Sequence, residues 1–427
     1  MNFKGKKLLV LGATANEIPL VRRAQSYGIY VIVTDYNLDH RLSPAKEVAD
    51  EYWDISWADI DALEKLCKEK GVNGITAGFS EFRVDNLIKL TERLGLPCYA
   101  NRKQLAITRD KSLFKSECRK YNVPTIHDYS KLEEVDHYPV IVKPVDRAGS
   151  IGVGIAWNDT QLKEAYENAM DKSVAKQVII EDYITNATEM DVHYAICNGK
   201  IILLSTDDII QAANNKADGK VVQSVWLYPC RHESDFLKKV DSNMRNMIRG
   251  LGIENGTIFF SGFSFPNGDF SFFECGFRLW GEQEFEFDYR RGLVNYLDIY
   301  IVHALSGNLR DVKPNNVGNA NLKGAAINFY VKGGVISAIK GLADIATMED
   351  CTITLMDGYI GQICNDDSSI LSKSALVGFA SESPVKLEQD VQDAYQSYEV
   401  IGTDGEDMIY DRIPKGIIER WWNQENI

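Results

Sequence analysis

The sequence has no long apolar run, no basic cluster and no metal-binding spacing of cysteine or histidine. No stretch of 18 apolar residues is present, so no membrane-spanning helix is expected. No run of five or more Lys and Arg occurs, and the net charge of −14 opposes binding to nucleic acid or to anionic lipid. We therefore expect no nucleic-acid partner and no membrane partner.

Cysteine and histidine are sparse and scattered. The eight cysteines include no CxxC pair, and the six histidines include no HExxH motif. This usage excludes a disulfide framework and has the wrong spacing for a zinc site. The apolar run Leu8–Leu11 is too short for the core of a secretory signal, and a first β-strand is the better interpretation. A reduced, cytoplasmic location is expected.

The first hundred residues alternate continuous apolar runs with helical patterns. The runs cover residues 7–12, 29–35 and 74–79, and the helical patterns cover 18–27 and 60–70. Strands that are apolar throughout are typical of a parallel sheet covered on both faces, so residues 1–108 are predicted to form a Rossmann-like domain. The turn after the first strand is not GxGxxG, because Thr14 replaces a glycine. An oxidoreductase that binds nicotinamide or flavin is therefore a weak alternative.

From about residue 110 the pattern changes to hairpins and helices, which favours an α+β arrangement. Hairpins are predicted around Asn198-Gly199 and Asn267-Gly268, and a single helix over 236–251. Residues 321–332 and 335–340, flanking Gly333-Gly334, are predicted to form a C-terminal hairpin. These changes of pattern predict two further domains, over residues 109–312 and 313–427.

A glycine-rich turn over residues 149–154 joins two predicted strands. It is not a Walker A loop, since no Gly-Lys-Ser/Thr follows and no helix opens there. Such a turn can offer backbone N–H groups to a polyphosphate, with Lys143, six residues before Gly149, supplying positive charge. Taken alone, the turn is more typical of an ordinary β-turn.

Further motifs follow in a fixed order: Glu181–Ile184 after one strand, Glu189 at the start of the next, and Phe272–Arg278 at the end of a hairpin. This order resembles the ATP-grasp superfamily of carboxylate–amine and carboxylate–thiol ligases. Within it, the sequence pattern is most similar to amino-acid ligases and biotin-carboxylase-like enzymes. The resemblance runs from about Lys7 to Ser306. It implies an α/β protein with a Rossmann-like N-terminal domain, an ATP-grasp α+β domain and a small C-terminal α+β domain.

The resemblance also implies a role for individual residues, with ATP and Mg²⁺ as cofactors. Lys111 and Lys143 would contact phosphates, Ser150 and Gly152 would lie in the loop that covers them, and Glu189 would accept the ribose hydroxyls. Glu181 and the backbone of Asp182 to Ile184 would read adenine, Glu274 would bind magnesium, and Arg278 and Glu282 would be catalytic. The family usually binds magnesium with two acids and an asparagine. Here the first acid falls at or beside Gly262, next to Ser261, and the asparagine position is Gly276, so only Glu274 remains.

The resulting prediction is an ATP-dependent ligase, of the amino-acid or dipeptide type, that acts on a small-molecule carboxylate and an amine. It would form an acylphosphate and release ADP and phosphate. One alternative is a bicarbonate-using carboxylase or a carbamoyl-phosphate-type enzyme. The other is a nucleotide-binding scaffold or sensor whose metal site has degraded. The apolar N-terminal unit leaves a homodimer open.

Overall fold

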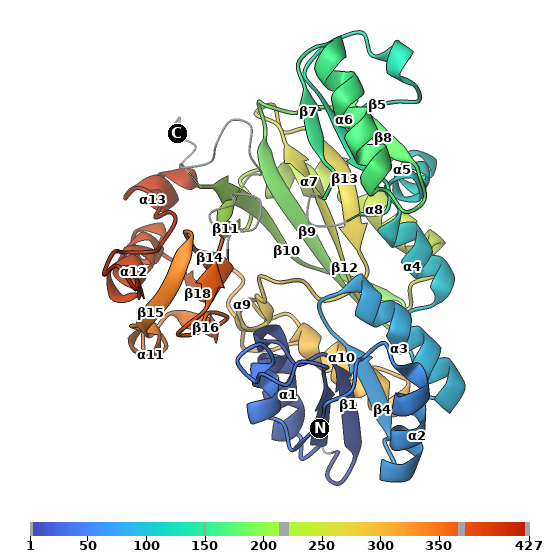
Figure 1. Cartoon of the computed structure of the whole chain (residues 1–427), viewed down its shortest axis with the longest axis vertical. Coiled ribbons are helices and arrows are strands. Elements are labelled where there is room, and N and C mark those ends of the chain that lie inside the picture. The colour runs from blue at the N-terminus through green and yellow to red at the C-terminus, as the bar shows by residue number, and fades with distance from the viewer. Residues whose placement is uncertain (1–2, 148–150, 213–221, 366–371, 423–427) are drawn as a thin grey trace.

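The computed structural model describes residues 3–147, 151–212, 222–365 and 372–422. Figure 1 shows an N-terminal unit at the bottom of the view, a small sheet with its helix at the top, a long sheet between them, and the C-terminal helices at the left. None of the helices in these described ranges is long and apolar enough to cross a membrane.

The N-terminal unit is a parallel sheet with the strand order β3-β2-β1-β4. Four of the five residues of β1 and of β2 are buried, which the apolar runs predicted. Its elements are β1 (Lys7–Leu11), α1 (Ile18–Ser26), β2 (Tyr30–Thr34), β3 (Glu51–Trp53), α2 (Ile60–Lys70), β4 (Gly74–Ala77), α3 (Glu81–Leu94) and α4 (Arg102–Arg109). The predicted Rossmann-like pattern is confirmed.

A helix from far along the chain completes this unit. α10 (Tyr296–Ser306) is almost entirely buried and packs against β4, β1 and α1. The approach is close at Gly74, where an added Cβ would lie 2.4 Å from the carbonyl oxygen of Ala304. Only glycine fits there, so the start of β4 packs directly against the backbone of α10.

The central sheet has eight strands in the order β13-β12-β9-β10-β11-β14-β18-β16, and all neighbours are antiparallel. The sheet contains strands from both sides of the predicted domain limit at residue 312, because β14 pairs with β11. The domain limits 108 and 312 remain predictions. The strands are β9 (Thr188–Cys197), β10 (Lys200–Gln211), β11 (Gln223–Tyr228), β12 (Asn255–Ser264), β13 (Phe270–Gly276), β14 (Lys323–Val331), β16 (Cys351–Met356) and β18 (Ser372–Ser381).

A second, smaller sheet has the order β5-β8-β6-β7 and its own apolar core. It consists of β5 (Asp128–Tyr129), β6 (Val140–Pro144), β7 (Gly154–Ala156) and β8 (Val178–Asp182), and α6 (Asp159–Lys172) packs on it (Figure 1). α5 (Lys111–Lys120) links it to the N-terminal unit. The small sheet meets the central one near β13, where Thr125 pairs with Phe272.

Two sequence predictions are wrong in detail. Residues 236–251 form two helices, α7 (Glu233–Lys239) and α8 (Asp241–Gly250), because the backbone of Val240 leaves the helical region. The predicted hairpin after residue 321 does not form. Both edges of the buried strand β14 are taken by β11 and β18, so β15 (Gly334–Lys340) pairs instead with β17 (Ile363–Cys364) and β19 (Glu399–Gly402).

The remaining helices lie beside these sheets. α9 (Phe285–Arg290) follows β13, and α12 (Pro384–Ser397) packs on β14 and β18. α11 (Leu342–Ile345) and α13 (Ile417–Trp421) both contact α12, which lies at the left of Figure 1.

Candidate active site

Lys111 is fixed by the cap of the helix that it begins. Asp110 ends α4 and caps α5, where its carboxylate accepts hydrogen bonds from the amides of Ser112 and Leu113, both at 2.9 Å. Lys111 therefore projects from the first turn of α5, the end at which a helix favours anions. Its Nζ lies 3.4 Å from Glu274 Oε2 and donates to the carbonyl of Arg147 at 3.1 Å. A cation in this position is available to a phosphate.

Lys143 comes from the small sheet and reaches the central one. Its Nζ lies 5.0 Å from the centre of the Phe273 ring on β13 and 2.9 Å from Glu181 Oε2. The Glu181 side chain is 1% exposed and also pairs with Lys115. Burial tends to raise the pKa of Glu181, but Lys143 and Lys115 outweigh burial and lower it. The Glu181 side chain thus orients lysines, and the role of Glu181 in reading adenine stays a prediction.

The backbone that follows β8 has one amide, that of Ile184, without a backbone hydrogen bond among the described residues. The amide of Asp182 donates to the carbonyl of His127 and that of Tyr183 to the carbonyl of Pro139, at 3.1 and 3.0 Å. Within the described residues, the amide of Ile184 donates to no backbone carbonyl. An amide that is free at the end of a buried strand suits the edge of a purine. The role of Asp182 and Ile184 stays a prediction.

Glu189 lies at the start of β9, near residues that are predicted to bind phosphate and metal. Gln223 donates to its Oε1 at 2.7 Å. Burial is the main cause that raises its pKa to about 7, and the charge of Glu274 adds to the effect while Lys143 opposes it. Glu189 is therefore electrostatically coupled to the residues with which it is predicted to share a nucleotide.

The glycine-rich turn is only partly described. Ser150 lies outside the described residues. Gly152 has a φ of +76°, and an added Cβ would lie 2.8 Å from Cβ of Lys172 and 3.0 Å from Cγ of Pro144. Glycine is thus required at position 152 by conformation and by space.

Two of the three ligand positions expected for magnesium are glycines without room for a side chain. Glu274 is present on β13, with a side chain 44% exposed. An added Cβ at Gly262 would lie 2.5 Å from the carbonyl oxygen of Ser271, and one at Gly276 would lie 2.3 Å from the ring of Phe259. No side chain fits at either position, so the family's usual set of three ligands does not fit this chain.

Arg278 and Glu282 follow β13 in the segment that leads to α9. Arg278 Nε lies 2.5 Å from Glu81 Oε1, its Nη1 donates to the carbonyl of Leu279 at 2.7 Å, and its guanidinium lies 5.0 Å from the Phe259 ring. Burial, together with the neighbouring Glu284, raises the pKa of Glu282. A carboxyl with a raised pKa is suited to proton transfer near neutral pH.

A polar cluster that the sequence analysis missed lies on β9 and β10. Asp191 and His193 follow Glu189 at alternate positions of β9 and so share its face of the sheet. Asp207 is the partner of Asp191 on β10, and one ligand atom from each of the three side chains lies within 4.8 Å of the other two. The alternation Glu189-x-Asp191-x-His193 was visible in the sequence. The pairing of Asp191 with Asp207 on β10 was not, because it depends on the strand register.

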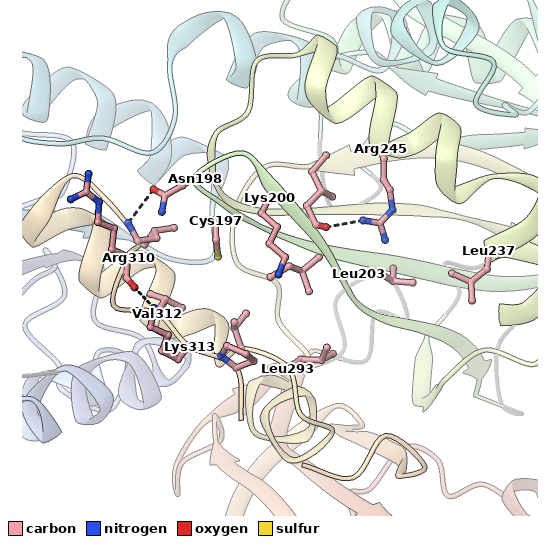
Figure 2. Close-up of a pocket in the computed structure, with 15 residues that line it drawn as sticks. Cys197, Asn198, Lys200, Leu203, Leu237, Arg245, Leu293, Arg310, Val312 and Lys313 are labelled. Atoms are coloured by element: carbon pink, nitrogen blue, oxygen red, sulfur yellow. Dashed lines mark hydrogen bonds between the residues drawn. The ribbon is translucent and has the colours of Figure 1, made fainter. Parts of the chain in front are cut away.

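A hollow in the surface is separate from all of these residues. It has a volume of about 760 Å³ and is lined by β10, α8 and the segment after α10. Figure 2 shows four of its cations, Lys200, Arg245, Arg310 and Lys313, beside Leu203, Leu237 and Leu293. None of the predicted site residues lines it.

Comparison with known proteins agrees with the fold described above. Residues 112–218 match the family model described as the D-ala D-ala ligase C-terminus. The structure superposes on the biotin carboxylase domain of 2-oxoglutarate carboxylase from Hydrogenobacter thermophilus, with a TM-score of 0.77, 18% identity, and coverage of 98% of this chain and 97% of the other. These matches confirm the resemblance to the ATP-grasp superfamily. An L-amino acid ligase from Bacillus licheniformis shares the fold, with a TM-score of 0.71, 16% identity and coverage of 94% and 99%.

Curated relatives give a similar picture. The formate-dependent phosphoribosylglycinamide formyltransferase of Sulfolobus acidocaldarius is 24% identical over 265 residues, or 58% of this chain and 65% of the relative. The enzyme of that name from Francisella tularensis is 27% identical over 197 residues, which cover 43% of this chain and 50% of the relative. The chain thus spans half to two thirds of the length of these relatives.

Proposed function

We propose that the chain is an ATP-dependent ligase that joins a carboxylate to an amine through an acylphosphate and releases ADP and phosphate. The observation that carries the proposal is the convergence of Lys111, Lys143 and Glu274 from α5, β6 and β13. Two cations and one carboxylate match the needs of a triphosphate with a divalent ion. The Hydrogenobacter structure was determined with MgADP, ADP and bicarbonate, which supports a nucleotide site in this fold.

The chemistry follows from these positions. A carboxylate oxygen of the substrate attacks the γ-phosphorus, ADP leaves, and an acylphosphate forms. The amine then attacks the acyl carbon, and phosphate leaves with the electrons of the broken C–O bond. Lys111 and Lys143 hold the phosphates, Arg278 neutralises the developing charge, and Glu282 accepts the proton of the amine. Because Gly262 and Gly276 exclude two of the usual magnesium ligands, no step is assigned to a metal held there.

We further propose a substrate of the amino-acid or dipeptide type and a cytoplasmic location. The test is release of phosphate from ATP with pools of amino acids, with ADP and AMP measured separately. Hydroxylamine, added with an acid pool and no amine, traps an acylphosphate as a hydroxamate. Phosphate, ADP and hydroxamate that appear only with particular pools would support the ligase.

Other outcomes would favour the alternatives. Phosphate release that requires bicarbonate and no amino acid would support a carboxylase or a carbamoyl-phosphate-type enzyme. ATP binding without turnover under any condition would support a nucleotide-binding scaffold or sensor, which the closure at Gly262 and Gly276 favours specifically. AMP in place of ADP would contradict an acylphosphate.

A further inference from the structure

The strand register places four polar residues in one row across the central sheet. Glu274 on β13 is the partner of Ser261 on β12, Ser261 is the partner of Asp191 on β9, and Asp191 is the partner of Asp207 on β10. Direct partners on neighbouring strands share a face of the sheet. The row thus has no acid on β12, where Ser261 stands next to the position at or beside Gly262 at which the ATP-grasp resemblance places one, and it carries two acids on the strands beyond.

The side chains of this cluster are held in fixed orientations. Asp207 Oδ1 accepts a hydrogen bond from the backbone amide of Asp191 at 3.1 Å. His193 Nδ1 lies 3.0 Å from Glu284 Oε1, and that oxygen also accepts from Trp280 Nε1 at 2.6 Å. A carboxylate beside one ring nitrogen is the usual support of a histidine whose other nitrogen binds a metal.

The atoms that face one another inside the cluster lack hydrogen bonds. His193 and Asp207 are 1% and 0% exposed, and His193 Nε2 forms an ion pair with Asp207 Oδ2 at 3.1 Å that does not meet hydrogen-bond geometry, while the buried Asp191 Oδ1 has no hydrogen-bond partner. Two ligands at right angles around one metal ion, with bonds of about 2.2 Å, are also about 3.1 Å apart. The separation therefore suits a shared ion.

We propose that Asp191, His193 and Asp207 bind a divalent transition-metal ion, one to two strands away from the position of the family's magnesium acid. An imidazole with two carboxylates suits Mn²⁺, Fe²⁺ or Zn²⁺ better than Mg²⁺ or Ca²⁺, which prefer oxygen ligands alone. Trp280 and Phe259 pack beside the His193 ring, at 4.3 and 6.4 Å between ring centres, and limit access of water.

The set of ligand atoms also suits an ion at this place. The buried carboxyl groups of Asp207 and Glu284 and the half-buried Asp191 surround a single imidazole. A divalent cation would engage oxygen atoms that this one ring does not, such as Asp191 Oδ1. Because all its protein ligands come from β9 and β10, binding requires no nucleotide and does not depend on the proposed ligase activity.

The test is a titration of the chelator-treated full chain with Mn²⁺ in the absence of nucleotide, followed by loss of the free-ion EPR signal. We expect about one bound Mn²⁺ per chain, unaffected by excess Mg²⁺. Pulsed EPR should detect coupling to the ¹⁴N of His193, a readout that requires no variant. Asp191→Asn and Asp207→Asn, checked for folding by near-UV circular dichroism, should each weaken binding by about 100-fold or more.

Glu274→Gln is the matched control, because Glu274 lies in the same row but two strands from Asp191. It should leave the affinity for Mn²⁺ within about twofold of wild type. Absence of bound Mn²⁺, absence of ¹⁴N coupling, or loss of binding in the Glu274 variant with retention in the Asp191 variant would each overturn the proposal. None of these results would alter ATP binding, which is measured separately.

Discussion

Replacement of Glu181 by glutamine should loosen the small sheet where β6 meets β8. Glu181 is 1% exposed and lies between Lys143 and Lys115, whose side chains are 13% and 1% exposed. Glutamine keeps the size of the side chain but removes its charge. Two lysines would then lack their buried counter-ion, and removal of one member of a buried ion pair costs about 3 to 5 kcal/mol.

The structure places this effect at the lower end of the range. Lys115 would keep its hydrogen bond to the carbonyl of Ile126, at 2.6 Å, and its weaker pairing with Asp128, at 3.6 Å. Lys143 would keep the Phe273 ring and some contact with water. We therefore expect a loss of about 3 kcal/mol, which corresponds to roughly 100-fold faster local opening.

Hydrogen exchange of the amides in β6 and β8, followed by mass spectrometry, measures that opening. Glu92→Gln is a matched control, because Glu92 pairs with Arg102 at 2.6 Å but is 54% exposed. Solvent screens an exposed pair, so exchange near Glu92 should change by less than about fivefold. If exchange in β6 and β8 changes by less than about tenfold, or no more than in the control, the assigned role of the buried triad is refuted.

The pH dependence of the same experiment has a defined sign. Burial raises the pKa of Glu181, but Lys143 and Lys115 outweigh it, so the folded-state pKa lies below the ordinary value of 4.5. The ionised carboxylate therefore stabilises the sheet above pH 4.5, and this contribution is lost as the pH falls through the folded-state pKa. The difference between wild type and the Glu181 variant should be full at pH 7 and should shrink below pH 4.5.

Three further predictions concern the candidate site. Lys143→Ala should weaken ATP binding by about 10- to 100-fold in calorimetry, since it removes a charged hydrogen-bond donor, and an unchanged affinity would exclude Lys143 from the site. Glu274→Gln should spare metal-free ATP binding but abolish Mg²⁺-dependent turnover, and full activity would show that another group holds the metal. Gly276→Ala should lower the free energy of unfolding by about 1 to 3 kcal/mol in urea, because its Cβ would meet Phe259 at 2.3 Å, and a wild-type midpoint would refute that contact.

Much of the order of elements was readable from local patterns. Helix α2 has the predicted bounds Ile60–Lys70, and β1 and β2 lie within the predicted apolar runs. Lys143 was singled out because it lies at the end of an apolar strand, whereas Lys111 came from the resemblance alone, and the roles of both stay predictions. Such features depend on neighbours within a few residues, which the sequence shows directly.

Sheet order and register were decided only by the tertiary structure. Adjacent segments such as β14 and β15 entered different sheets, because β11 and β18 occupy both edges of β14. The pairing of Glu181 with two lysines from other elements could not be read from its neighbours in the sequence. The row that joins Glu274 to Asp207 exists only through the pairing of four strands. A strand's own residues specify which face is buried, but its neighbours are selected by packing across the whole chain, and so these contacts could not be read from the sequence.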